Sequence, residues 1–367
     1  MKKVLMIRTS LHGGGAERII SEISNNLVKN GHEVDIFLWE NINVYNLDKR
    51  INIYISDMPQ AFRTFHSFCL KLFGNLAYTI TSPIFIYYLK KKLNIKSYDY
   101  IYIHSLASIL QFLYLRRENC FNIFHSVKSE LLFKNKRFLS KWKNKLMISL
   151  AGNLKNNVCV SKGIKSDLKE EFYITAETIY NPFDISHIII ESQKTNLDLT
   201  NYGKYILNIG RLDKIKNQSE VIKAFHSVKD KYDTLLILGD GPEKESIISL
   251  INELNLNEKV FLLGFVSNPY IYIKSATVVV SASLLEGFGN TIVESLILKT
   301  PVISSDCPCG PREIMLPPLD KYLYTVNSTE SLIRALKLFS DHDYPIDSFD
   351  MNRFEIDIIC KKYLDLK

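Results

Sequence analysis

Two segments of the chain begin in the same way, and this repetition constrains the fold more than any other feature. Residues 4–7 form a short apolar run that predicts a buried parallel strand, and Gly13-Gly14-Gly15 follows it. Apolar residues then recur at helical spacing as far as Leu27, and residues 34–38 predict the next strand. The order strand, glycine loop, helix, strand is typical of a βαβ unit.

The second beginning lies past the middle of the chain. Residues 205–209 form another apolar run, and Gly210, a basic loop and a predicted helix at 219–228 follow it. Apolar runs predict further strands at residues 100–103, 122–125, 157–160, 234–238, 260–263, 277–280 and 302–304. Helical patterns separate them. The sequence therefore predicts an α/β protein with two doubly wound, Rossmann-like domains in tandem.

The length of 367 residues also indicates two domains, because one domain typically has about 100–200 residues. The join is expected between Pro182 and Asn201, where Asn, Asp, Ser and Thr are frequent. We assign residues 1–184 to an N-terminal domain, 185–345 to a C-terminal domain and 346–367 to a helix expected to pack back toward the first domain. Open α/β sheets bind ligands at the carboxyl ends of their strands, so two such domains facing each other are expected to form a cleft.

The net charge of +7 is distributed unevenly. Through Asp184 the chain has 26 basic and 15 acidic residues, whereas the remainder has 20 and 24. The basic front half indicates an anionic partner, although no nucleic-acid recognition motif accompanies it. With 46% hydrophobic and 23% charged residues, the composition is that of an ordered globular protein.

Several features bear on compartment and membrane contact. Six cysteines in so long a chain do not indicate a disulfide framework, and the apolar run at residues 4–7 is too short for a signal peptide. Residues 72–89 lack charge but contain several polar residues, which argues against a membrane span. They predict either a buried or surface helix broken near Pro83, or an element lying on an anionic membrane. The seven basic residues within 128–145 favour the membrane surface. We therefore expect a cytoplasmic protein that is peripheral on the inner face of the cytoplasmic membrane.

The glycine triplet is the first of three motifs with chemical meaning. Its glycines allow a ligand to approach the backbone, and the following helix offers unpaired N–H groups to an anion. A tight turn without any ligand is the alternative. The spacing is not that of the dinucleotide fingerprint, which argues against an NAD-dependent oxidoreductase.

The second motif is Gly210-Arg211-Leu212, with Lys214 and Lys216 nearby. Cations directly after a strand suit a diphosphate: Arg211 through its forked guanidinium and Lys216 as a point charge. Taken alone, a solvated basic loop explains the segment equally well.

The third motif runs from Glu286 to Ser295 and leads from a predicted strand into a helix. Asn290 is a suitable N-cap, which would place the N–H groups near Thr291 and Ile292 toward an anion. Glu286 and Glu294 would flank that helix start and accept hydrogen bonds from sugar hydroxyls. An acid in the first turn can also simply stabilise the helix dipole, but this does not explain Glu286, which lies in the loop beside a glycine.

In this order the motifs resemble those of the family 4 retaining glycosyltransferases. The matching segments cover nearly the whole chain: the glycine triplet with Ala16-Glu17-Arg18, Val160-Ser161-Lys162-Gly163, Asn181-Pro182, Gly210-Arg211-Leu212 with Lys216, Gly239-Asp240-Gly241-Pro242, and Glu286 to Glu294. The resemblance implies the GT-B fold, two Rossmann-like domains facing across a cleft. It also implies transfer of a sugar from a nucleotide diphosphate with retention of configuration.

The resemblance also implies roles for individual residues. Arg211 and Lys216 would bind the donor diphosphate, Glu286 the sugar hydroxyls and Glu294 the ribose. The base would lie near Phe265, and His125 would lie near the sugar, with His104 as its rival. Glu286, His125, Arg211 and Lys216 are the implied catalytic residues. The implied donor site consists of Gly14, Gly15, Gly210, Arg211, Lys216, Gly241, Phe265, Glu286, Phe288, Gly289, Asn290, Thr291, Ile292 and Glu294.

The expected substrates are a nucleotide-diphosphate sugar, with UDP favoured, and a polyprenyl-diphosphate-linked saccharide used in bacterial surface-polysaccharide synthesis. Cations and a helix dipole can neutralise the leaving diphosphate, so we expect no metal and no other cofactor. Two alternatives share the fold: a sugar-nucleotide epimerase, and a non-catalytic sugar-nucleotide-binding assembly protein. A non-catalytic protein would be expected to lose some of the site residues, but this chain keeps all four: Arg211, Lys216, Glu286 and Glu294.

Overall fold

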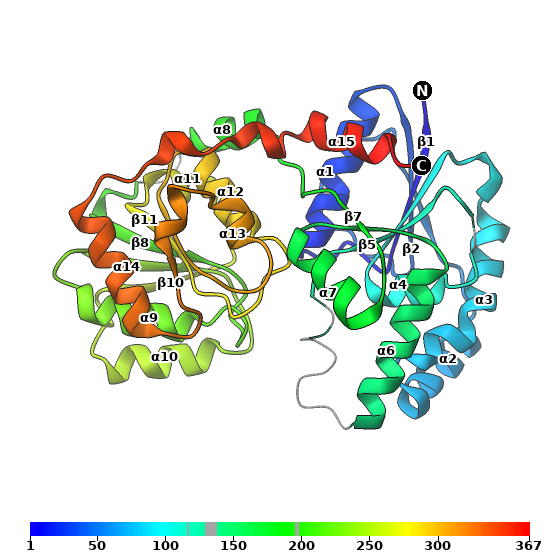
Figure 1. The fold of residues 1–367 in the computed structure, drawn as a ribbon, viewed down its shortest axis with the longest axis horizontal. Coiled ribbons are helices and arrows are strands. Elements are labelled where there is room, and N and C mark those ends of the chain that lie inside the picture. Colours follow the sequence, from blue (N-terminus) through cyan, green and yellow to red (C-terminus); the bar gives the residue numbers. More distant parts are fainter. Residues whose placement is uncertain (116, 128, 130–137, 195–197) are drawn as a thin grey trace. The chain divides into compact units, whose positions relative to one another are not determined.

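The computed structural model describes residues 1–367 except 116, 128, 130–137 and 195–197 (Figure 1). The chain forms two compact units. The first comprises Met1–Pro182 together with Ile356–Lys367, and the second is Phe183–Glu355. Each unit has one parallel sheet with helices on both faces, which confirms the predicted α/β class.

The sheet of the first unit has seven parallel strands in the order β3-β2-β1-β4-β5-β6-β7. Their bounds are β1 Lys3–Arg8, β2 Glu33–Leu38, β3 Asn52–Ile55, β4 Tyr100–His104, β5 Cys120–Phe124, β6 Asn156–Cys159 and β7 Glu177–Thr178. The chain builds outward from β1 to β3 and then returns to the other side of β1 with β4. The carboxyl ends of β1 and β4 therefore flank the point where the strand order reverses, which is where such sheets bind ligands.

Helices pack on this sheet through apolar faces that recur at helical spacing. Their bounds are α1 Gly15–Lys29, α2 Gln60–Phe73, α3 Leu76–Lys92, α4 Leu106–Gln111, α6 Phe138–Asn153, α7 Lys162–Phe172 and α15 Ile356–Leu364. In α1 the buried residues include Ile19, Ile23 and Leu27. The chain leaves α1 at Gly31, whose φ of +81° is readily adopted only by glycine, as expected of a helix end.

The second unit has a six-stranded parallel sheet in the order β10-β9-β8-β11-β12-β13. Its strands are β8 Tyr205–Ile209, β9 Thr234–Leu238, β10 Val260–Gly264, β11 Val278–Ser281, β12 Val302–Ser305 and β13 Leu323–Tyr324. Its helices are α8 Ile185–Ser192, α9 Gln218–Val228, α10 Lys244–Glu253, α11 Tyr270–Ser275, α12 Asn290–Ile297, α13 Pro311–Ile314 and α14 Thr329–Asp341. Here the strand order reverses between β8 and β11.

The C-terminal residues return to the first unit later than residue 346. Residues 346–355 belong to the second unit, and Ile356 begins the returning segment. Helix α15 then packs on α1: Asn26 Nδ2 donates to Asp357 Oδ1 at 2.9 Å. Tyr102 of β4 donates to the carbonyl of Tyr363 at 2.7 Å. The first boundary falls at Pro182/Phe183, two residues before the expected position.

The apolar segment at residues 72–89 does not form one helix broken at Pro83. The break lies at Gly74, whose φ is +58°, between the end of α2 and the start of α3. Pro83 lies inside α3 and exposes its ring. Among the residues that the structure describes, no helix is long and apolar enough to cross a membrane.

Candidate active site

The second unit gathers several predicted site residues at the carboxyl edge of its sheet, where the strand order reverses. Gly210 and Arg211 directly follow β8, and Ser283 and Glu286 lie in the loop after β11. The two loops are joined because the amide of Leu284 donates to the carbonyl of Ile215 at 2.7 Å. Adjacent loops at such a point form the ligand site in open α/β sheets.

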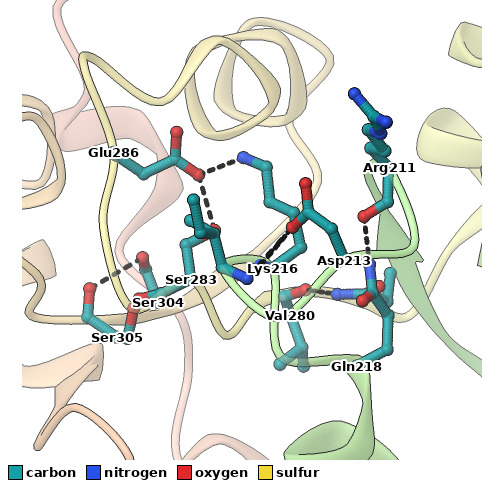
Figure 2. Close-up of polar contacts among 11 residues, drawn as sticks. Arg211, Asp213, Lys216, Gln218, Val280, Ser283, Glu286, Ser304 and Ser305 are labelled. Carbon is teal, nitrogen blue, oxygen red and sulfur yellow. Dashed lines mark hydrogen bonds and ion pairs between the residues drawn. The ribbon is translucent and has the colours of Figure 1, made fainter. Parts of the chain in front are cut away.

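Lys216, Glu286 and Ser283 meet at this point (Figure 2). Lys216 Nζ donates to Glu286 Oε1 at 2.5 Å, and Ser283 Oγ donates to the same oxygen at 2.6 Å. Glu286 Oε2 accepts no hydrogen bond from any described residue. One carboxylate oxygen is thus fixed by the protein, while the other is left to accept hydrogen bonds from a ligand.

The pair between Lys216 and Glu286 is shielded but accessible, since the Lys216 side chain is 30% exposed and that of Glu286 13%. Burial on its own would lower the pKa of Lys216, but the charge and hydrogen bond of Glu286 outweigh it and raise that pKa. Lys216 is therefore cationic at neutral pH. The thiol of Cys307 lies close enough to respond to both charges; burial, and then the Glu286 charge, raise its pKa to about 12. Cys307 is thus a neutral neighbour of the pair.

The loop that carries the cations is held by its own hydrogen bonds. Asp213 Oδ1 accepts from the amides of Ile215 and Lys216, each at 3.0 Å. Gln218 Nε2 donates to the carbonyl of Arg211 at 3.1 Å. The Arg211 side chain is exposed, points away from Glu286 and makes no hydrogen bond or ion pair within the described part of the chain (Figure 2). Its guanidinium is therefore available to an anion.

Glycines allow the neighbouring loops to pack backbone against backbone. A Cβ at Gly239, whose φ is +139°, would lie 1.9 Å from the carbonyl oxygen of Gly210. A Cβ at Gly241 would lie 2.4 Å from the carbonyl oxygen of Leu212. Gly241, predicted as a donor-binding residue, therefore has a packing role independent of any ligand. The Gly239-Asp240-Gly241 segment therefore packs directly against the loop that carries Arg211.

The start of α12 differs from the prediction. Gly289, with φ of +106°, is the N-cap, and Asn290 is already the first helical residue. Asn290 is therefore not the N-cap. Glu294 is the fifth residue of the helix rather than part of the first turn, and it is 4% exposed. The Ile292 amide, predicted to face an anion, instead donates to the Gly289 carbonyl at 3.0 Å. The Thr291 amide remains a part of the first turn suited to an anion.

Two aromatic residues of the predicted site have opposite environments. The Phe288 ring is buried against Phe183 and Phe354, with ring centroids 6.4 and 5.6 Å away, so only its backbone can border a ligand. Phe265 is 80% exposed and follows Gly264, whose φ of +71° turns the chain at the end of β10. An exposed ring at a strand end suits stacking on a nucleotide base.

In the first unit, the two rival histidines form a pair. His104 ends β4 and His125 directly follows β5; His104 Nδ1 and His125 Nε2 are 2.9 Å apart. His104 is buried, and its Nε2 has no hydrogen-bond partner among the described residues, whereas His125 is partly exposed. One ring donates to the other across this contact, and the direction depends on the tautomers of the two rings. The sequence offered these residues as alternatives, and the structure places both at one site.

The glycine triplet lies after the carboxyl end of β1, and its last residue, Gly15, begins α1. Gly14 is the N-cap, and Glu17 in the first turn forms an ion pair with Arg8 at the end of β1. A Cβ at Gly14 would lie 2.4 Å from Glu17 Oε2. A carboxylate of the chain itself therefore lies beside the helix start where Gly14 and Gly15 were predicted to approach a phosphate. That predicted role is not tested by this geometry.

No group of three or more His, Cys, Asp or Glu side chains in the described part of the chain is placed to hold a metal ion. The sequence does contain Asp341-His342-Asp343, whose spacing occurs in metal-bridging motifs. This triplet lies at the end of α14, where Asp341 pairs with Lys231 at 3.1 Å. Lys231 precedes β9, so the triplet lies at the amino edge of the sheet, opposite Glu286. A metal-free reaction stays a prediction.

The fold defines a class, the α/β proteins with two Rossmann-like units, and comparisons with known proteins identify the family. Residues 13–187 match the model described as "Glycosyltransferase Family 4", and residues 190–348 match "Glycosyl transferases group 1". The chain belongs to glycosyltransferase family 4 and has the GT-B fold.

Individual relatives agree with this assignment. An N-acetylgalactosamine-N,N'-diacetylbacillosaminyl-diphospho-undecaprenol 4-alpha-N-acetylgalactosaminyltransferase from Campylobacter jejuni is 38% identical over 186 residues, which is 50% of each chain. A lipopolysaccharide 1,6-galactosyltransferase from Salmonella typhimurium is 30% identical over 49% of this chain and 51% of its own. The chain thus spans about half the length of the curated relatives it matches. HepE from Anabaena, solved with UDP and glucose, shares the fold with a TM-score of 0.75 and 18% identity, covering 100% of this chain and 99% of its own.

The buried histidine generates a pH-dependent stability. Burial, and then the charges of His125 and Arg8, lower the pKa of His104 well below its usual range. The unfolded chain therefore binds a proton near pH 6.5 that the folded chain does not, so stability is complete above that pH and decreases below it. Between pH 6.5 and 5.5, this proton should lower the unfolding free energy of the wild type by about 1 kcal/mol. The variant His104→Asn should lack this part of the decrease.

Urea unfolding at both pH values measures this difference. The matched control is His342→Asn, which replaces an exposed histidine and should leave the pH dependence of the wild type intact. An unchanged pH dependence in His104→Asn would contradict the neutral, buried state of His104.

Proposed function

We propose that this protein is a retaining glycosyltransferase. It transfers a hexose or N-acetylhexosamine from a UDP-sugar to a lipid-linked saccharide in bacterial surface-polysaccharide synthesis. The observation that carries the proposal is Glu286, held through one oxygen by Lys216 and Ser283 at the point where the strand order of the second sheet reverses. Other ion pairs of the chain, such as that of Lys231 with Asp341, also use one carboxylate oxygen. The position of Glu286 at the reversal of strand order is what supports a ligand role.

Three features of the second unit would bind the diphosphate. Lys216 supplies a fixed cation, Arg211 supplies an exposed guanidinium on the same loop, and the N-terminus of α12 supplies N–H groups. These positive groups stabilise the charge that develops on the leaving diphosphate, which is the role a divalent metal has in other transferases. We therefore propose a metal-independent reaction.

The remaining groups would recognise the sugar and the nucleoside. Glu286 Oε2 accepts hydrogen bonds from sugar hydroxyls while Lys216 and Ser283 keep the carboxylate in place. The Phe265 ring stacks on the base. Glu294 is the proposed ribose ligand, and its burial requires a small movement of α12 or of the preceding loop before a ribose can reach it.

Transfer would follow a front-face route. The bond between the anomeric carbon and the phosphate oxygen breaks, and the acceptor oxygen forms its bond on the same face. The proton of the acceptor hydroxyl passes to the departing phosphate oxygen, so UDP leaves as the protonated product. In this route Arg211 and Lys216 hold the leaving group, and no carboxylate nucleophile is needed. A role for His125 near the sugar, and for Gly14 and Gly15 near the phosphate, remains part of this proposal.

The acceptor is inferred from the relatives and from charge. The Campylobacter relative is named for a diphospho-undecaprenol acceptor and the Salmonella relative for a lipopolysaccharide. The first unit of this chain carries most of the positive excess. An acceptor with a diphosphate on a lipid anchor is consistent with both.

Removal of either cation tests the site. Arg211→Ala and Lys216→Ala are each expected to lower kcat by about 10²–10³ because a charged contact to the leaving group is lost. Arg211 is exposed, so Arg211→Ala should keep the wild-type melting temperature. Lys216→Ala leaves the shielded Glu286 carboxylate without its cation and should lower the melting temperature, so its rate is measured well below that temperature. Lys214→Ala removes an exposed cation from the same loop and is the matched control, with an expected activity near that of the wild type. Wild-type rates in both Arg211→Ala and Lys216→Ala would remove the phosphate assignment.

Metal independence is tested with the purified enzyme, UDP-sugar and acceptor in excess EDTA. Because Arg211, Lys216 and α12 supply the positive groups, the initial rate should be unchanged within about twofold. If EDTA abolished activity and added Mg²⁺ or Mn²⁺ restored it, a metal ion would be the group that neutralises the leaving diphosphate.

A further inference from the structure

Helix α2 of the first unit exposes an apolar stripe. Phe65, Phe68 and Leu72 recur at helical spacing and are 50–59% exposed. The face of α2 that carries Phe62 and His66 is instead packed against α3: the His66 ring lies 5.1 Å from the rings of both Tyr78 and Phe85. The helix is therefore already anchored to the unit, and its stripe is a second face turned to the outside.

Helices α3 and α6 repeat this arrangement. On α3, Ile80, Ile84 and Tyr87 are 37–60% exposed, and the opposite face is buried. On α6, Trp142, Leu146 and Leu150 are 44–60% exposed, while Met147, Ile148 and Ala151 are buried. Each stripe follows the spacing of one helix face. Three helices with outward apolar stripes are unusual for a protein surface that remains in water.

The three helices are neighbours in the first unit (Figure 1). Helix α2 packs on α3, and Lys143 Nζ of α6 donates to the carbonyl of Phe73 at the end of α2 at 3.0 Å. We name the surface formed by the nine stripe residues of α2, α3 and α6 the three-helix surface. Its members are Phe65, Phe68, Leu72, Ile80, Ile84, Tyr87, Trp142, Leu146 and Leu150.

Charge on these helices has one sign. The bounds of α2, α3 and α6 contain no Asp or Glu. They contain eight basic residues: Arg63, Lys71, Lys90, Lys91, Lys92, Lys141, Lys143 and Lys145. Lys71, Lys90, Lys91 and Lys141 are exposed and pair with no acid among the described residues. Lys92 pairs with Asp57, and Lys145 lies 3.9 Å from Glu171. The surface therefore combines apolar side chains with several lysines that have no counter-charge among the described residues.

We propose that the three-helix surface lies on an anionic lipid bilayer. Aromatic and aliphatic stripe residues enter the interfacial region, and the lysines contact the anionic headgroups. Charge disfavours the same face of a second copy as the occupant, because such a dimer would bring two sets of exposed lysines without acidic partners together. Since the opposite faces of the helices are buried in the unit, the helices lie along the membrane rather than across it.

This inference extends the proposed function by stating how the enzyme reaches a lipid-linked acceptor, but the surface does not depend on donor chemistry. It adds α6 and the exposed face of α2 to the segment at residues 72–89 that the sequence indicated. The part of the basic stretch 128–145 that comprises Lys128 and residues 130–137 lies outside the described residues.

Co-sedimentation with vesicles tests the proposal in the absence of donor and acceptor. Wild-type protein is mixed with vesicles of phosphatidylglycerol and phosphatidylcholine, or of phosphatidylcholine alone. Binding should require the anionic lipid and weaken in 0.5 M salt. The triple variant Lys71→Gln, Lys90→Gln and Lys141→Gln should bind about 100-fold more weakly, at about fivefold per lysine. The variant Phe68→Ser with Trp142→Ser should lose at least about tenfold through lost apolar contact.

Matched controls separate a specific surface from general charge. Lys165→Gln, Lys169→Gln and Lys361→Gln remove three exposed lysines elsewhere on the first unit, and they should bind less than about tenfold more weakly than the wild type. Ile190→Ser with Ile358→Ser removes exposed apolar residues elsewhere and should bind as the wild type does. Equal loss in the control and test sets would overturn the proposal, as would wild-type binding in the test variants. A wild-type dimer that the test variants convert to monomers, without any vesicle binding, would assign the surface to self-association.

Activity on a detergent-dispersed acceptor separates this result from the proposed function. The surface variants should retain wild-type transfer rates there, because none of the changed residues belongs to the donor site. Vesicle binding without transferase activity would support the surface and remove the enzyme assignment. Transferase activity without vesicle binding would support the enzyme assignment and overturn the proposed membrane surface.

Discussion

The ion pair between Lys216 and Glu286 joins the loops that leave the two central strands of the second sheet, and the candidate site depends on it. Each partner keeps the other charged in a shielded position, and Ser283 fixes which carboxylate oxygen is used. The loops after β8 and β11 lie close together, and the Leu284 amide joins them by donating to the Ile215 carbonyl at 2.7 Å. On its other side the β8 loop packs against Gly239 and Gly241, which lie in the loop after β9. The reversal of strand order and the ion pair thus leave one oxygen of Glu286 for a ligand.

Much of the fold could be predicted from the sequence, because buried parallel strands are continuous apolar runs. The central strands β1, β8 and β9 fall within a residue of their expected bounds. The strands that sequence reasoning missed, β3, β7 and β13, are short and lie at sheet edges, where one side has no partner strand. Such strands need little apolar sequence. The helix break at Gly74 was also missed: a proline in a helix can stay at an exposed position, whereas the positive φ of Gly74 changes the chain direction.

The sequence indicated which residues lie near the candidate site better than it indicated how their side chains are arranged. Lys216 and Glu286 meet because loops after neighbouring strands lie at one edge of the sheet, whereas the Arg211 side chain points away from Glu286. Sequence could not show that Ser283 completes the cluster, because a serine in a loop has no distinctive pattern. Nor could it show that the Phe288 ring turns into the core, or that His104 supports His125 from a buried position. These features depend on side-chain packing between segments that are distant in sequence.

The central claim is that Lys216 binds the diphosphate while Glu286 recognises the sugar. Calorimetric titration of UDP and of a UDP-N-acetylhexosamine into the wild type, Lys216→Ala and Glu286→Gln tests it most directly. The account predicts that Lys216→Ala weakens both ligands, and the sugar nucleotide at least as much as UDP, because Lys216 also holds the Glu286 carboxylate. Glu286→Gln should weaken only the sugar nucleotide, by about tenfold or more, and leave UDP affinity unchanged or higher. Equal weakening of UDP and the sugar nucleotide in Glu286→Gln, or unchanged UDP binding in Lys216→Ala, would contradict the account.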